Sequence, residues 1–208
     1  MQNGKTHRRF LILCWENLFS LVILNLLFLL CAIPVITFPA AATALSRGCQ
    51  SCLEEEGKPV KLFFPCFRRT VFRAMPMGLV LLAGHAGLIY CIMFYVANYG
   101  GSIVGIACAM FCMVSFYLLF AITSCVFHIQ ARLECDGRTG LRNAVHIMIK
   151  EYQLLFTWLA LSFAIVGLIA WFFPYTFPLA LLLAFSLSNM AAACGVLPYI
   201  EKHLKELM

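Results

Sequence analysis

Two cysteines, Cys49 and Cys52, form a C-x-x-C pair, the spacing in this 208-residue sequence that is best suited to chemistry. Such a pair suits a bound metal ion or a redox reaction. A closed zinc site needs four ligands, and Cys66 and Cys135 are the further thiols that polar segments offer. The simpler interpretation is that the chain uses its 11 cysteines mainly as small apolar side chains. We therefore expect no cofactor, no disulfide and no metal, and keep these four thiols as minor metal candidates.

Three polar residues, Glu16, Asn25 and His85, fall inside apolar segments and form a candidate polar site within the membrane. Ionisable groups at membrane depth are functional candidates. The alternative for His85 is a neutral imidazole that hydrogen-bonds a neighbouring helix. Glu16 is interpreted as an anchor near the interface, and Asn25 as a partner for an interhelical hydrogen bond. The sequence contains no nucleotide-binding loop and no hydrolase or metalloprotease motif, so we expect no enzyme and no catalytic residue.

The composition indicates a membrane protein: 63% of the residues are hydrophobic and 12% are charged, and the mean hydropathy is +0.92. Three long runs contain no charged residue, and the second and third are each long enough for two crossings of about 20 residues. Spanning segments of this length must be helical, because a bilayer leaves the backbone no other partner. We expect one all-α transmembrane domain over 1–208, with six embedded helices at 10–33, 39–52, 74–97, 103–128, 152–173 and 177–198, and cytoplasmic segments at 53–73 and 129–151.

The first apolar run contains Pro34 and Pro39, each of which should kink or end a helix. Thr37 lies between them and can satisfy part of the freed backbone. The second helix of the run is therefore expected to be short, with alanines that allow close packing.

The basic residues sort to one side of the predicted hairpins. Of 15 Lys and Arg residues, three lie in 1–9, six in 47–73, four in 129–151 and two in 199–208. Cytoplasmic loops collect such residues, so both termini are expected in the cytoplasm and the protein in the cell membrane. The alternative has five spans and an external N-terminus.

The segment 61–73 alternates aromatic and basic side chains, which is typical of an interfacial helix on anionic lipid. A nucleic-acid partner is not expected, because the positive-inside bias accounts for the net charge of +6. The lipid-facing residues are expected to be Phe63, Phe64, Phe67, Arg68, Arg69 and Arg73.

Residues 25–45, NLLFLLCAIPVITFPAAATAL, resemble the signature of the YesL-like family, small bacterial integral membrane proteins with a domain of unknown function. Residues 55–67, 127–134 and 141–144 resemble further segments of that family. His128 and Gln130 depart from it, since the family usually has Pro and Leu there. The motif residues that we single out are Pro34, Pro39, Arg132, Glu134 and Asn143.

The resemblance implies a link to carbohydrate use, because such proteins are often encoded beside sugar-uptake and polysaccharide-degrading systems in Gram-positive bacteria. The first hypothesis is a non-enzymatic accessory or regulatory protein that contacts a sugar-transport complex or a second copy of itself. One alternative is a small-solute transporter or channel, since a broken helix often marks a transport site. Another is a membrane enzyme, or a metal or redox site, that uses the cytoplasmic cysteines.

Overall fold

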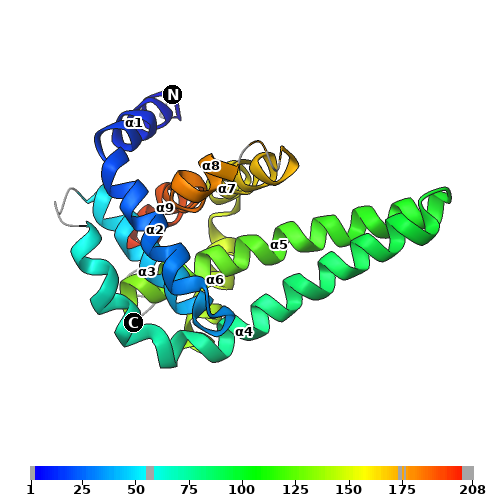
Figure 1. Ribbon diagram of the computed structural model, residues 1–208, viewed down its shortest axis with the longest axis horizontal. Coiled ribbons are helices and arrows are strands. Elements are labelled where there is room, and N and C mark those ends of the chain that lie inside the picture. Colours follow the sequence, from blue (N-terminus) through cyan, green and yellow to red (C-terminus); the bar gives the residue numbers. More distant parts are fainter. Residues whose placement is uncertain (1–2, 55–58, 173–174, 176, 203–208) are drawn as a thin grey trace.

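Every regular element in the computed structural model is helical, over the residues that it describes: 3–54, 59–172, 175 and 177–202 (Figure 1). The prediction of an all-α fold is confirmed. The elements are α1 (Asn3–Glu16), α2 (Leu18–Ala32), η1 (Val35–Thr37), α3 (Phe38–Leu53), α4 (Pro59–Tyr99), α5 (Ile103–Leu133), α6 (Gly137–Lys150), α7 (Tyr152–Trp171), α8 (Phe177–Leu179), η2 (Ala180–Ala184) and α9 (Phe185–Lys202).

Helix α3 lies at the centre of the molecule. Thirteen of its 16 residues are buried, and it packs against α2, α4, α5 and α9. Ala40, Ala41 and Ala44 are completely buried; their small side chains let four neighbouring helices approach the α3 backbone. The run of small residues after the prolines therefore forms the core around which the other helices assemble.

The break between α2 and α3 has the predicted cause. Pro34 is extended and precedes the short 3-10 turn η1, and a second proline stands in the first turn of α3. The hydroxyl of Thr37 lies 2.6 Å from the carbonyl oxygen of Cys31 and 2.8 Å from that of Pro34. It thus donates to the Cys31 carbonyl, which the broken helix leaves open, and lies beside the Pro34 carbonyl, which also accepts from the backbone nitrogen of Thr37 at 2.9 Å.

The predicted continuous helix over 10–33 is wrong, because α1 and α2 meet at Asn17 with a bend of 76°. The Asn17 side chain donates from Nδ2 to the carbonyl oxygen of Leu13 at 3.0 Å. Asparagine competes for backbone groups in this way and so favours a helix boundary. The local signal is weak, since the residues on either side, Glu16 and Leu18, are both good helix formers.

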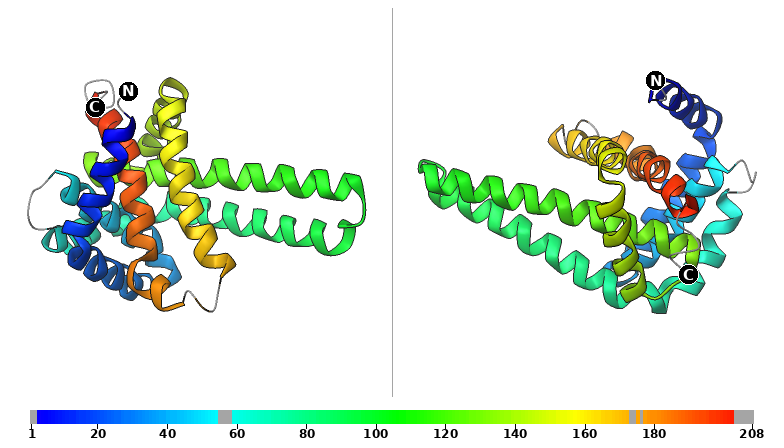
Figure 2. Two further views of the ribbon diagram at one scale, coloured as in Figure 1. Left: turned by 90° about the horizontal axis from the view of Figure 1, so that it is seen from above. Right: turned by 180° about the vertical axis from the view of Figure 1, so that it is seen from behind.

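Helices α4 and α5 form an antiparallel arm that extends away from the other helices (Figures 1 and 2). Helix α4 starts at Pro59 rather than near 74, and it carries Pro65 and Pro76 inside it. Figure 1 shows its first part bending before it enters the arm, as interior prolines require. Within the arm, residues 86–118, most side chains are exposed, and only Gly105 and Ala109 are buried.

Helices α7 and α9 pack side by side and run across the direction of the arm (Figure 2). By length and composition, α4, α5 and residues 182–202 are each able to cross a membrane, and the bent α1–α2 pair is a fourth candidate. These candidates are fewer than the six embedded helices predicted. The short α3 and the described apolar part of α7, Phe156–Ile169, are the segments that fall below the required length.

Candidate functional site

A cavity of about 240 Å³ lies where α2, α3, α4, α5, α7 and α9 converge. Its wall is mainly aromatic and aliphatic, with several hydroxyls and one amide. The broken helix contributes residues from both of its parts, namely Phe28 from α2 and Phe38 from the start of α3. The other lining residues are Ala42, Leu45, Gly78, Leu82, His85, Phe120, Thr123, Ser124, Phe127, Ser162, Val166, Phe185, Ser188 and Asn189.

Two serines from adjacent helices bond each other on the wall of the cavity. The Ser188 hydroxyl lies 3.1 Å from the carbonyl oxygen of Ser162, and the two hydroxyl oxygens are 2.7 Å apart. Each hydroxyl has one proton. Ser188 therefore donates to the carbonyl and Ser162 donates to Ser188, so that both protons are used and lone pairs remain for a ligand.

The side-chain oxygen of Asn189 accepts a hydrogen bond from Ser46. The Ser46 hydroxyl lies 3.0 Å from Asn189 Oδ1 and also 3.0 Å from the carbonyl oxygen of Ala42. Within the described residues, Asn189 Nδ2 has no hydrogen-bond partner. The fixed oxygen orients the amide and leaves two N–H donors on a residue that lines the cavity.

His85 also lines the cavity, from α4. Its Nδ1 lies 2.8 Å from the carbonyl oxygen of Leu81. A carbonyl only accepts, so Nδ1 carries the proton and Nε2 of the neutral ring is an acceptor. The ring stands edge-to-face against Phe116, with centroids 5.2 Å apart. The predicted alternative, an imidazole that bonds a different helix, does not describe this contact, because Leu81 belongs to the same helix.

The structure does not bring the three predicted polar residues together. Asn25 is completely buried on α2, and its Oδ1 accepts from the backbone nitrogen of Ser186 at 3.0 Å. Ser186 follows the π-helical turn η2, so Asn25 caps a backbone group beside an irregular turn, in agreement with the predicted interhelical bond. Glu16 ends α1 with an exposed side chain. Of the three, only His85 reaches the cavity.

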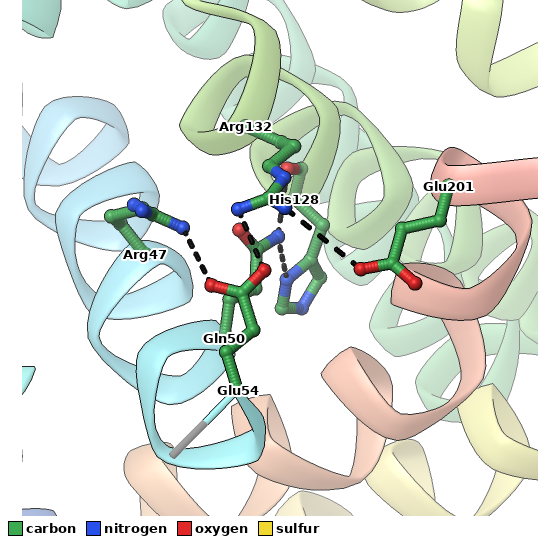
Figure 3. A network of polar contacts seen from close by, with 6 residues as sticks. All are labelled: Arg47, Gln50, Glu54, His128, Arg132 and Glu201. Atoms are coloured by element: carbon green, nitrogen blue, oxygen red, sulfur yellow. Dashed lines mark hydrogen bonds and ion pairs between the residues drawn. The ribbon is translucent and has the colours of Figure 1, made fainter. Parts of the chain in front are cut away.

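A network of charged side chains joins the C-terminal ends of α3, α5 and α9 (Figure 3). The carboxylate of Glu54, just after α3, lies 3.2 Å from Arg47 and 2.6 Å from Arg132. Arg132 also lies 3.8 Å from Glu201 of α9. The Glu54 side chain is only 14% exposed, so both of its ion pairs are partly shielded from water.

A buried amide–imidazole pair lies beside this network. Gln50 Nε2 donates to the carbonyl oxygen of His128 at 2.9 Å and lies 3.3 Å from its Nδ1 (Figure 3). Both residues are completely buried. Among the described residues, Gln50 Oε1 and His128 Nε2 have no partner, and neither does the side chain of Gln130.

The family-motif residues occupy distinct positions. Pro34 and Pro39 border the helix break. Arg132 contacts α3 and α9, whereas Glu134 ends α5 in the left-handed region (φ 49°) and pairs with Arg69 at 2.8 Å. Asn143 is buried on α6. The motif residues therefore maintain helix ends and contacts between helices.

The predicted lipid-facing segment is helical, as expected, but one of its residues is placed differently. Phe63 is completely buried, so its assignment to lipid is wrong. Phe64 is exposed and Phe67 is half-buried. Phe63 stacks on Phe67 and belongs to the core around Cys49 and Cys52, because the first part of α4 lies against α3. The basic residues Arg68, Arg69 and Arg73 are exposed.

The four candidate cysteines do not assemble into a metal site in the part of the chain that the structure describes. Cys49 and Cys52 are buried in α3, and Cys49 Sγ donates to the carbonyl oxygen of Ser186 at 3.6 Å. Burial raises the pKa of the Cys135 thiol, in the turn after α5. Deprotonation to a metal-binding thiolate is disfavoured there. Cys66 is half-buried.

The serine pair at Ser162 and Ser188 was not predicted. Each serine lies in a charge-free apolar run and is 26 residues from the other, so that only the packing of α7 on α9 shows that they meet. In an apolar helix, polar residues that recur on one face are the sequence signal for a polar contact with a neighbouring helix. In α9, Ser186 and Asn189 are three residues apart and share a face, but Ser188 lies two residues from Ser186 and belongs to another face, so this signal does not single it out.

Comparisons with known proteins give a family and no function. Residues 21–95, which contain the helix break, α3 and most of α4, match the model of a family described as a protein of unknown function, DUF624. No curated protein and no solved structure matches the chain. The family is that of the YesL-like bacterial membrane proteins, so the predicted resemblance is confirmed. Residues 21–95 of the chain therefore match the DUF624 family, that of the YesL-like membrane proteins.

Proposed function

We propose that this membrane protein is a non-enzymatic accessory or regulatory component that acts through lateral contacts with other membrane helices. The observation that carries this proposal is the exposure of the arm. In the most apolar 18-residue stretch of α4 only 6% of the residues are buried, and in that of α5 only 11%. In the corresponding stretch of residues 182–202, 61% are buried. A charge-free surface of this extent fits contact with apolar partner helices within the bilayer.

The proposal includes a place for the protein in the cell membrane, with both termini in the cytoplasm. The distribution of Lys and Arg supports this orientation. The family resemblance supports a partner from a carbohydrate-uptake system. The apolar cavity is not the site of sugar recognition in this proposal, because a sugar needs a polar partner for most of its hydroxyls.

Site-specific photocrosslinking in cells tests the proposal. A benzophenone amino acid at Phe111, which is 73% exposed on the arm, should yield adducts with a membrane subunit of a sugar-uptake system or with a second copy of the chain. The same group at Trp171, 84% exposed on α7, is the control away from the arm. Adducts with lipid alone at Phe111 would exclude a protein partner for the arm.

A small-solute transporter or channel is a second candidate, and one observation favours it. Both parts of the broken helix, through Phe28 and Phe38, line the same cavity as His85. Transporters commonly place their substrate beside a discontinuous helix. Flux of labelled small solutes into liposomes that contain the protein should fall on His85→Ala substitution; equal flux with and without protein would reject this candidate.

A further inference from the structure

The cavity contains polar groups that the protein itself does not satisfy. In the described part of the chain, Asn189 Nδ2, His85 Nε2 and the hydroxyl of Ser124 have no hydrogen-bond partner, and all three residues line the cavity. Lone pairs of the Ser162–Ser188 pair add acceptor capacity. These three residues are half-buried, and in an otherwise apolar wall their free polar atoms favour a bound molecule that offers them a hydrogen-bond partner.

The rest of the wall sets the size and shape of such a molecule. Five phenylalanines surround a volume of about 240 Å³. An apolar cavity of about 150 Å³ holds benzene, so a single substituted ring fits. Aromatic walls also favour a flat ring, which they contact edge-on or offset.

The charge of the wall restricts the ligand further. The described residues that line the cavity include no Asp, Glu, Lys or Arg. An ion that enters such a site loses its hydration without gaining a counter-charge. A polyhydroxylated ligand such as a sugar would leave most of its hydroxyls unpaired against phenylalanine and leucine.

We propose that the cavity is a binding site for a small, uncharged aromatic molecule that carries one hydroxyl or carbonyl group, of the phenol type. The ring occupies the phenylalanine-lined part, and its polar group bonds the Asn189 amide, the His85 imidazole or both. A phenol both donates and accepts, so it can donate to His85 Nε2 and accept from Asn189 Nδ2. This inference does not depend on the proposed accessory role.

A fluorine NMR experiment on the purified full chain in lipid nanodiscs tests the site. The probes are 4-fluorophenol, fluorobenzene and 4-fluorobenzoate, with empty nanodiscs to measure partition into lipid. The fluorine resonance of 4-fluorophenol should shift and the shift should saturate with protein concentration. Fluorobenzene should bind more weakly, and 4-fluorobenzoate should not bind. A phenol keeps its proton at neutral pH, since its pKa is about 10 as in tyrosine.

Three variants locate the binding. Val166→Phe adds a ring to the wall and should abolish binding of both neutral probes. His85→Phe keeps an aromatic ring beside Phe116 but removes the hydrogen-bond acceptor. It should weaken the affinity for 4-fluorophenol by about three- to tenfold. Binding of fluorobenzene should change little in that variant. Ala42→Leu provides a second way to fill the cavity if Val166→Phe does not fold.

Two results would overturn the proposal. One is equal binding of fluorobenzene and 4-fluorophenol that His85→Phe does not change, which would indicate an apolar site without polar recognition. The other is binding that neither cavity-filling variant reduces, which would place the probes in the lipid or elsewhere on the protein. Thermal unfolding of each variant confirms that it is folded before binding is compared.

Discussion

Gly78 lies so close to Pro39 that a Cβ atom added at Gly78 would stand 2.2 Å from the Cβ of the proline. This contact joins the N-terminal turn of α3 to α4 at the wall of the cavity. Neither partner can move easily, because a proline ring and a helical backbone are both stiff. The family proline and the small residue opposite it therefore fix how closely α3 and α4 approach.

Gly78→Ala should destabilise the protein by roughly 1–3 kcal/mol, the usual cost of overpacking. Thermal unfolding in a mild detergent measures the change. Gly87→Ala is the matched control on the same helix, since no atom of the described residues lies within 4 Å of a Cβ atom added there. That variant should be neutral or more stable by up to about 1 kcal/mol, the helix propensity gained. Equal effects of the two substitutions would show that the Pro39 contact is not close.

Glu54→Gln should be strongly destabilising, because it leaves Arg47 and Arg132 close together without their shared carboxylate. A broken, partly buried pair costs about 3 kcal/mol. Glu134→Gln is the control, because Glu134 and Arg69 are 53% and 67% exposed, and an exposed pair contributes below about 1 kcal/mol. Chemical unfolding in detergent at low salt compares the two. A smaller loss for Glu54→Gln than for Glu134→Gln would contradict the network in Figure 3.

The features of the fold that were predictable are those with local causes. The two prolines place the start of α3 within one residue of its predicted position, and both observed ends lie within one residue of the predicted 39–52. Thr37 could be assigned to the break because its acceptors lie only three and six residues away. The bend at Asn17 was missed because one asparagine gives a weak signal inside a strongly apolar run.

The features that were not predictable depend on packing between distant segments. Arg132 pairs with Glu54 and Glu201, which are far from it in sequence, and Glu134, only two residues away from Arg132, pairs with Arg69 instead. His85 could be singled out from its depth in an apolar run. The serines that share its cavity lie on α7 and α9, and their meeting depends on how six elements converge.

Gln130→Leu should stabilise the protein by roughly 1–2 kcal/mol, since it removes a desolvated amide whose oxygen and nitrogen both lack a partner among the described residues. Leucine is similar in volume to glutamine, and Gly137 and Gly140 line the space beside the side chain.

Gln50→Leu is the opposing control for Gln130→Leu. The Gln50 amide bonds the carbonyl oxygen of His128, so its loss should destabilise the protein by about 1–3 kcal/mol. The midpoints of thermal unfolding of the two variants should therefore move in opposite directions. A destabilised Gln130→Leu variant would imply that the Gln130 amide has a partner, such as bound water.

An epitope tag inserted after Gly101 should be accessible to antibody on intact cells, whereas a tag before residue 1 should become accessible only after the membrane is permeabilised. The positive-inside bias predicts both results, because 98–102 contains no Lys or Arg and 1–9 contains three. Gly101 tolerates the insertion, since it is exposed and no described atom lies within 4 Å of a Cβ atom added there. An N-terminal tag that is accessible on intact cells would establish the alternative, in which 10–46 crosses once, and would move Lys5, Arg8 and Arg9 outside.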